Sequence, residues 1–208
     1  MWTDAELVAR ALNGSQDAFR ELVERFERPV FSLVVRMVQD AGTAEDLAQE
    51  IFVKAFRRLD TFDPGRKFSS WIFKIAHNTT IDHLRKGTSD TVPLETDSEE
   101  GGSLLAVLAD PVESPAAAAE RRDLGRALEQ AIATLRSEYR EAVLLFYVEG
   151  ASYLEICEIT GQPLGTVKTN LHRARKELAV AMQALGWQPR SGGRPAAERS
   201  ETDPVLDS

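Results

Sequence analysis

The residues with the clearest chemical signature lie in one short stretch near the C-terminal end of the chain, LGTVKTNLHRARKEL. Drawn as a helix, this stretch gathers cations and hydrogen-bonding groups on one face, with no acid before Glu177. Cations can bind DNA phosphates, and short polar side chains can bond base edges in a major groove. The residues concerned are Lys168, Thr169, His172, Arg173, Arg175 and Lys176. The face alone also fits a solvated basic helix without a ligand.

Two short helices joined by a tight turn are predicted to position this face. Ser152, with Glu155 three residues later, forms a capping box for the first helix. Gly161 can adopt the positive φ of the turn, and Pro163 suits the first turn of the second helix. The buried stripe predicted for that helix is Leu164, Val167, Leu171, Ala174 and Leu178. This is the pattern of a helix-turn-helix, whose second helix enters the major groove.

The charge of the chain is unevenly distributed. Its 208 residues carry a net charge of −8, which argues against nucleic-acid binding at first sight. Residues 87–120, however, hold eight acids and no Lys or Arg, so the net acidity lies in this segment. The segment is also rich in Ser, Thr, Pro and Gly, which predicts a flexible acidic linker. The flanking segments are nearly neutral and can present basic faces.

Helical periodicity and N-cap signals predict the elements before the linker. The expected helices span residues 4–12, 16–38, 44–59 and 70–86, capped by Thr3, Ser15, Thr43 and Ser69. Pro29 should kink or divide the second helix. The third helix has a predicted buried face of Ala48, Ile51, Phe52, Ala55, Phe56 and Leu59. A separate stripe on it consists of Asp46, Gln49, Glu50 and Val53.

These patterns predict an all-α fold of two small helical domains, residues 1–86 and 121–186, joined by the linker at 87–120. Residues 103–109 could form a helical turn, and residues 187–208 are expected to be disordered. The single cysteine, Cys157, excludes an internal disulfide, fits a reducing cytosol, and is expected to fill a small core site rather than sense redox state. No apolar run is long enough to span a bilayer, so no membrane insertion is expected.

Nothing in the sequence indicates catalysis. The three histidines, His77, His83 and His172, belong to no cluster with metal-ligand spacing. There is no phosphate-binding glycine loop and no nucleophile motif. We therefore expect no catalytic residue, no metal and no cofactor.

Two stretches of the chain resemble a known family. DLAQEIFVKAFRRLDTFDPGRKFSSWIFKIAHNTTIDHLRK is similar to the second conserved region of bacterial sigma factors, and the stretch around LGTVKTNLHRARKEL is similar to their fourth region. Their order and short separation resemble the extracytoplasmic-function (ECF) group. The resemblance implies a cytoplasmic protein that binds the beta and beta-prime subunits of core RNA polymerase. It implies promoter DNA as the second partner, an anti-sigma factor as the third, and association with the nucleoid through polymerase.

The resemblance also assigns expected roles to residues. The polymerase-docking positions are Asp46, Gln49, Glu50 and Val53. The −10 promoter element is expected to meet Arg66, Lys67, Trp71, Lys74, Asn78 and Arg85, since aromatic and cationic groups suit an unstacked base and its backbone. Trp71 could equally be a core residue. The −35 element is expected to meet Thr166, Lys168, Thr169, Asn170, His172, Arg173, Arg175 and Lys176. Asn170 stands where many relatives have Arg, which leaves the base preference open.

Two other functions are compatible with parts of the sequence. A stand-alone helix-turn-helix regulator with a helical sensing domain would bind duplex DNA alone, whereas a sigma factor would need core polymerase. A purely interaction-based adaptor would leave the basic helix face unexplained.

Overall fold

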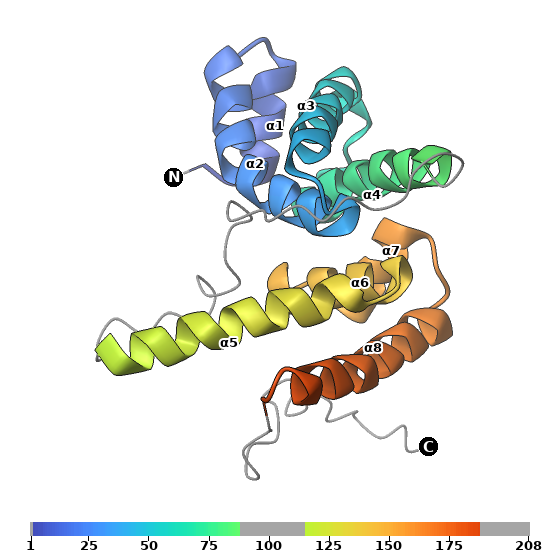
Figure 1. Cartoon of the computed structure of the whole chain (residues 1–208). Helices are drawn as coiled ribbons and strands as arrows, with labels where there is room; N and C mark the ends of the chain where they lie inside the picture. Colours follow the sequence, from blue (N-terminus) through green and yellow to red (C-terminus); the bar gives the residue numbers. More distant parts are fainter. Residues whose placement is uncertain (1, 88–114, 188–208) are drawn as a thin grey trace, which may run out of the picture.

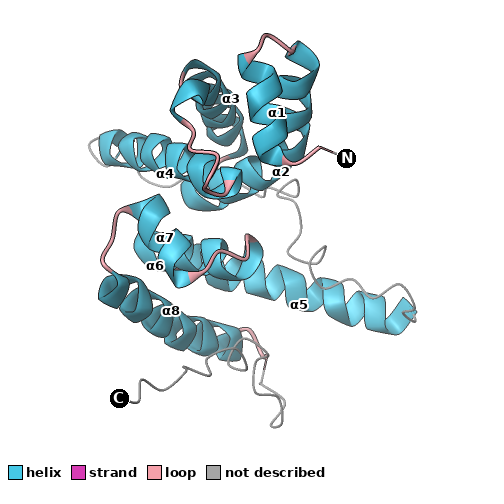
Figure 2. Cartoon of the chain, turned by 180° about the vertical axis from the view of Figure 1, so that it is seen from behind, coloured by secondary structure: helices cyan, strands magenta, loops and turns pink. Residues whose placement is uncertain are grey.

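The computed structural model of the chain describes residues 2–87 and 115–187. Within these residues all regular secondary structure is helical, as predicted (Figure 2). The N-terminal domain comprises α1 (Asp4–Leu12), α2 (Gln16–Val38), α3 (Ala41–Arg57), the 3-10 turn η1 (Leu59–Thr61) and α4 (Phe68–Gly87). The C-terminal domain comprises α5 (Pro115–Thr134), α6 (Ser137–Val143), the π-helical segment η3 (Leu144–Val148), α7 (Tyr153–Thr160) and α8 (Leu164–Ala184). The two domains lie against each other (Figure 1).

The first two helices begin where their capping residues predict. The backbone N–H of Thr3 donates to Glu6 Oε2 at 2.8 Å, and the N–H of Glu6 donates to Thr3 Oγ1 at 3.3 Å. These two bonds complete the predicted capping box. Ser15 accepts a bond from the N–H of Ala18 and caps α2. Although Pro29 removes one helical donor, α2 continues past it as a single helix, so the predicted division does not occur.

Two predicted helix starts are wrong. α3 begins at Ala41, because Asp40 and not Thr43 is its N-cap. The Asp40 carboxylate accepts the backbone N–H of Thr43 at 2.7 Å, which satisfies an N-terminal donor of the helix. α4 begins at Phe68, so Ser69 lies inside the first turn. Phe68 is buried in the core, and the helix starts two residues earlier than predicted.

One continuous cluster of buried apolar residues runs through both domains. Its fully buried members include Val30, Ile51 and Ile72 in the N-terminal domain, and Leu145 and Ile156 in the C-terminal domain. α4 packs on α7 and α2 packs on α6, so the core crosses the boundary between the domains.

Some side chains differ from the predicted burial. Phe56 is 60% exposed and Leu164 is 39% exposed, so neither belongs to the buried face predicted for it. Phe73, which the periodicity did not single out, is buried. Cys157 is half-buried and packs against the core, in keeping with the predicted small core residue.

α5 begins at Pro115, so the last six residues of the predicted linker are helical. The rest of the linker, with the possible helical turn at residues 103–109, lies outside the described residues. The predicted disordered tail lies outside them as well, apart from Trp187.

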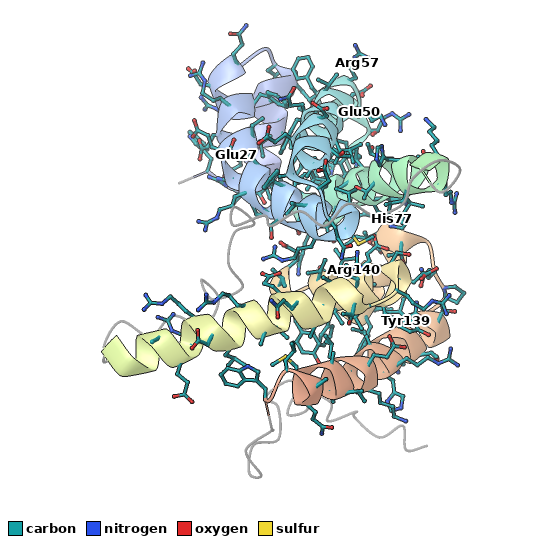
Figure 3. All side chains as sticks on the ribbon, in the orientation of Figure 1. Glu27, Glu50, Arg57, His77, Tyr139 and Arg140 are labelled. Carbon is teal, nitrogen blue, oxygen red and sulfur yellow. The ribbon has the colours of Figure 1, made fainter. Side chains whose placement is uncertain are left out.

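Polar contacts join the two domains around a buried arginine. The Arg140 guanidinium of α6 donates to the carbonyl oxygens of Arg36 and Met37 at the end of α2. Beside it, Arg36 Nη2 lies 2.6 Å from Glu129 Oε1 of α5, and Gln39 Nε2 donates to the carbonyl of Ala133. Arg140 lies between the two layers of helices (Figure 3). Burial lowers the pKa of Arg140 from its ordinary value.

A second polar contact joins α4 to α6. His77 Nδ1 lies 2.5 Å from Glu141 Oε1, and the Glu141 side chain is almost fully buried. His77 also lies between the two layers (Figure 3). The interface therefore contains ionisable groups as well as apolar packing.

Candidate nucleic-acid interface

The predicted helix-turn-helix is present in α7 and α8. Ser152 and Glu155 form the predicted capping box, with the N–H of Ser152 donating to Glu155 Oε2 at 2.8 Å. Gly161 ends α7 with φ 71°, the left-handed conformation that glycine adopts without strain. Pro163 precedes the first residue of α8, one position earlier than predicted. Local hydrogen bonding and turn chemistry thus fix the angle at which α8 leaves α7.

α8 has one buried face and one polar face. Val167, Leu171 and Ala174 are buried, as the apolar spacing predicts, and Leu178 is half-buried. The opposite face is exposed and carries no acid before Glu177. Its exposed members are Thr166, Lys168, Thr169, His172, Arg173, Arg175 and Lys176. Seven of the eight residues predicted for the −35 element are therefore accessible to a ligand.

Asn170 is the exception among these residues. It is half-buried, and its amide Nδ2 donates to Gln162 Oε1 in the turn at 3.0 Å. This bond links α8 to the preceding turn, so Asn170 helps to orient the helix.

Aromatic residues hold several cations at the edges of the polar face. Arg175 Nε donates to the hydroxyl of Tyr147 at 2.7 Å, and its guanidinium lies 5.9 Å from the Phe146 ring centroid. Lys168 Nζ lies 5.9 Å from the ring centroid of Tyr153. Such contacts favour one orientation of a long cationic side chain. The sequence analysis missed these aromatic partners, which lie on η3 and α7.

The residues predicted for the −10 element lie on α4 and the loop before it. Trp71 is half-buried and packs against Phe62 and Phe68, with ring centroids 5.9 and 5.3 Å away. Lys74, Asn78 and Arg85 are exposed along α4. Trp71 thus has a packing role and still borders the surface.

A cavity of about 230 Å³ lies beside Trp71. Its lining includes the side chains of Arg66, Lys67 and Lys74 from the N-terminal domain and Glu158 from α7. Cations and aromatic rings around one hollow match the chemistry needed for an unstacked base and its phosphate.

Ion pairs connect this loop to α7. Lys67 Nζ lies 2.7 Å from Glu155 Oε1, and Arg66 Nη1 lies 3.4 Å from Glu158 Oε2. Burial opposes ionisation of Glu155, but hydrogen bonds from Lys67 and Ser152 outweigh it and lower the pKa of the carboxyl group. Glu155 is therefore charged at neutral pH.

The predicted docking stripe of α3 is accessible. Asp46, Gln49, Glu50 and Val53 are all exposed, and Glu50 pairs with Lys54 at 2.7 Å. The sequence analysis missed one neighbour of this stripe, Phe56, which it assigned to the core. Val53 and Phe56 are both exposed and lie three positions apart on α3, so they are neighbours on the helix surface.

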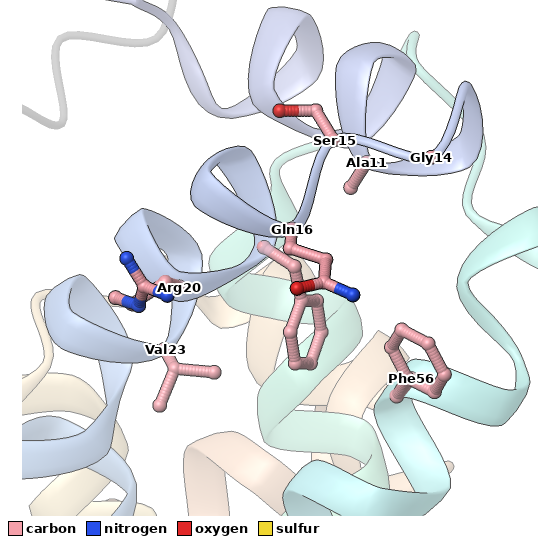
Figure 4. A pocket seen from close by; sticks show the side chains of 8 residues that line it. Ala11, Gly14, Ser15, Gln16, Arg20, Val23 and Phe56 are labelled. Atoms are coloured by element: carbon pink, nitrogen blue, oxygen red, sulfur yellow. The ribbon is translucent and has the colours of Figure 1, made fainter.

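Phe56 also borders a cavity of about 590 Å³ between α1, α2 and α3 (Figure 4). Phe19 packs edge-on against the Phe56 ring, with centroids 4.8 Å apart, and Val23 lines the same cavity. The cavity gives the α3 surface an apolar hollow next to its exposed stripe.

The described residues contain no group of three or more His, Cys, Asp or Glu side chains placed to bind a metal ion. Within residues 2–87 and 115–187, no helix is both long enough and apolar enough to cross a membrane.

Comparisons with known proteins match both domains. Residues 22–89 match the family model for Sigma-70 region 2, and residues 125–178 match that for Sigma-70 region 4. The chain is 37% identical over 180 residues to the ECF RNA polymerase sigma factor SigW of Bacillus subtilis, covering 86% of this chain and 96% of SigW. It is 35% identical over 188 residues to the ECF RNA polymerase sigma-E factor of Escherichia coli K12, covering 88% of this chain and 96% of that protein.

Solved structures share the fold. The structure of CnrH in complex with the cytosolic domain of CnrY matches with a TM-score of 0.60 and 26% identity, over 87% of this chain and 97% of that one. The sigma factor RpoE of Bartonella quintana, in complex with the anti-sigma factor NepR, matches with a TM-score of 0.62 and 24% identity, over 79% of this chain and 96% of that one.

The helical fold and these matches show that the chain is a sigma factor. Sigma factors are transcription-initiation proteins and are not enzymes. Within that class, the chain belongs to the extracytoplasmic-function group of the sigma-70 family. It binds core RNA polymerase and promoter DNA, as predicted from the sequence.

Proposed function

We propose that this sigma factor reads the −35 element with the exposed face of α8 and the −10 element with α4 and its preceding loop. The observation that carries the assignment is the exposed polar face of α8, the second helix of a helix-turn-helix whose first helix, α7, is capped by Ser152. In such motifs the N-terminal part of the second helix contacts base edges. Lys168 and Thr169 are therefore assigned to bases, and Lys176, further along the helix, to a phosphate.

The cavity beside Trp71 is proposed to receive one unstacked base of the −10 element. An aromatic wall can stack on a base of any sequence, and nearby cations can bind the adjoining phosphates. Arg66, Lys67 and Lys74 line the cavity and supply that charge. Asn78 and Arg85 would contact the strand further along α4.

Core polymerase is proposed to dock on the exposed stripe of α3. Asp46, Gln49 and Glu50 offer polar contacts. Val53 and Phe56 offer solvent-exposed apolar side chains that a partner could bury. A helix of the polymerase could pack along this stripe, since interfaces combine a buried apolar centre with a polar rim.

We infer that an anti-sigma factor regulates the chain in the cytoplasm, and that the chain joins the nucleoid through polymerase. The support is the shared fold with the sigma factor RpoE, which was solved in complex with the anti-sigma factor NepR. CnrH, which is also similar, was solved in complex with the cytosolic domain of CnrY. Purifying the chain from its native host and identifying the proteins bound to it tests this inference. A chain that carries no anti-sigma factor under any growth condition would contradict it.

Run-off transcription with purified core polymerase and a library of genomic fragments tests the proposed function. Specific transcripts that depend on the added chain are the expected result, and their start sites would define the promoter. A stand-alone regulator would give tight duplex binding without polymerase and no dependent transcript.

A further inference from the structure

The hydroxyl of Tyr147 lies beside the proposed −35 face, although Tyr147 belongs to neither helix of the helix-turn-helix. It is a residue of η3 and is 42% exposed. Its hydroxyl oxygen accepts the Nε–H of Arg175 at 2.7 Å. Because an arginine side chain has only hydrogen-bond donors, the direction of this bond is fixed. The O–H proton of Tyr147 can therefore be donated to another group.

Aromatic rings hold Arg175 in one orientation. Its guanidinium lies 5.8 Å from the ring centroid of Tyr147 and 5.9 Å from that of Phe146. The Phe146 ring in turn stacks on Tyr153, with centroids 5.2 Å apart. The bond to Tyr147 uses the Nε–H of the guanidinium. N–H groups on the two terminal nitrogens can still bind an outside ligand, because the Arg175 side chain is exposed.

The chemistry of this pair favours an anion. A guanidinium and a tyrosine O–H both donate, so one ligand satisfies them together only if it is an acceptor with several lone pairs. A DNA phosphate is such a ligand, and the pair lies on a face of α8 that carries no acid before Glu177. Arg175 also lies about two helical turns beyond Lys168. Since base contacts come from the N-terminal part of such a helix, the backbone is the expected ligand here.

We propose that Tyr147 and Arg175 together bind one phosphate of the −35 duplex, with the tyrosine hydroxyl donating to one phosphate oxygen and the guanidinium to another. Tyr147 is then a DNA contact that comes from outside the two helices of the motif. The inference rests on the proposed assignment of α8 to the −35 element. The contact adds affinity but no choice of base, because phosphates carry no sequence information.

The first variant removes only the hydroxyl. Tyr147→Phe keeps the ring and its edge-on contact with Phe146, whose centroid is 4.9 Å away. The matched control is Tyr139→Phe. The Tyr139 hydroxyl also accepts from an arginine, Arg173, at 3.4 Å, but Tyr139 is buried and cannot reach DNA.

The measurement is the affinity of core polymerase carrying each full-length chain for duplexes with the preferred −35 element and its single-base variants. Tyr147→Phe should bind all of them about three- to tenfold more weakly, because one hydrogen bond to a charged group is lost. The slope of log affinity against log salt concentration should stay unchanged, since a neutral hydroxyl releases no counterion. Arg175→Ala, in contrast, should lower that slope by about one unit.

Duplexes with a methylphosphonate at single positions identify the phosphate. A methylphosphonate replaces one phosphate oxygen by a methyl group and removes the negative charge. The position contacted by Arg175 is the one where Arg175→Ala no longer weakens binding. Tyr147→Phe should have no effect at that same position and should keep its full effect at every other position. Tyr139→Phe should have one constant effect at all positions.

If Tyr147→Phe weakened binding equally with and without the methylphosphonate, or did not weaken it at all, the proposal would be overturned. If no phosphate of the −35 element mattered to the unaltered chain, the assignment of α8 itself would be refuted, and the inference that rests on it would fall too.

Discussion

Arg140 of α6 donates a hydrogen bond to the backbone carbonyl of Met37 at the end of α2, over 3.1 Å. The same guanidinium donates to the carbonyls of Ala133 and Leu135 at the end of α5. Helix C-termini carry partial negative charge and unpaired carbonyl groups. One buried cation therefore stabilises the ends of two helices that belong to different domains.

Arg140→Met should destabilise the folded protein. The substitution keeps much of the apolar volume but leaves several buried carbonyl oxygens without a donor, at a cost of about 2–4 kcal/mol. Urea unfolding measures the effect. Arg122→Met, at an exposed position of α5, is the control and should change stability by less than about 0.5 kcal/mol. Equal stabilities of the two variants would show that Arg140 does not join the helices energetically.

Glu149 makes the stability depend on pH. Burial raises the pKa of this carboxyl to about 7, although the nearby Arg36 partly opposes the shift. Between about pH 4.5 and 7 the folded chain holds a proton that the unfolded chain releases, so this contribution to stability is lost as pH rises. Glu149→Gln should be more stable than the wild type by about 1–2 kcal/mol at pH 8 and similar at pH 5. If the variant and the wild type differed in unfolding free energy by the same amount at pH 5 and pH 8, this assignment would be contradicted.

Local signals in the sequence predicted a helix start correctly where only one nearby residue can act as the N-cap. Thr3, Ser15 and Ser152 bond the backbone within their own helical turn, so no distant contact can change their role. Thr43 failed because Asp40, three residues earlier, is a competing acceptor. Phe56 was assigned to the core because apolar periodicity alone cannot distinguish a buried aromatic residue from an exposed one.

The contacts between domains could not be predicted in the same way. Arg36 pairs with Glu129, 93 positions away, and such a pairing depends on how two folded surfaces meet. The exposed side of α8 was predictable, since helical spacing alone separates Val167 and Leu171 from Thr169 and His172. The residues proposed for the −10 element remain a prediction, and the ion pairs that Arg66 and Lys67 make with α7 could not be predicted from the sequence.

Docking on polymerase should depend on the α3 stripe. Asp46→Ala with Gln49→Ala should weaken binding to core polymerase about tenfold and leave the melting temperature unchanged, because both side chains are exposed. Glu45→Ala, an exposed acid beside the stripe, is the matched control. The measurement is the affinity of each fluorescently labelled variant for core polymerase, and only the Asp46/Gln49 variant should lose affinity. An unaltered affinity would exclude these positions from the contact, and a collapsed melting curve would show that they are structural.

Two variants of α8 should distinguish contacts to bases from contacts to phosphates. Lys168→Ala should cost about 1–3 kcal/mol on the preferred −35 element and relax the choice at one base pair. Lys176→Ala should weaken binding to all −35 sequences alike. It should also lower the slope of log affinity against log salt concentration by about one unit. Both are measured within the polymerase complex on single-base variants. A uniform loss for both variants would show that Lys168 does not read sequence.

The central claim is that this chain acts on promoters only together with core polymerase, through both domains at once. The most direct test is permanganate footprinting of a promoter selected by run-off transcription, with the chain alone, core polymerase alone, and the two combined. Reactive thymines at the −10 element should appear only in the combined sample, and should be lost with Trp71→Ala or with Lys168→Ala plus Lys176→Ala. A stable footprint on duplex DNA from the chain alone, with no opening when polymerase is added, would contradict the account.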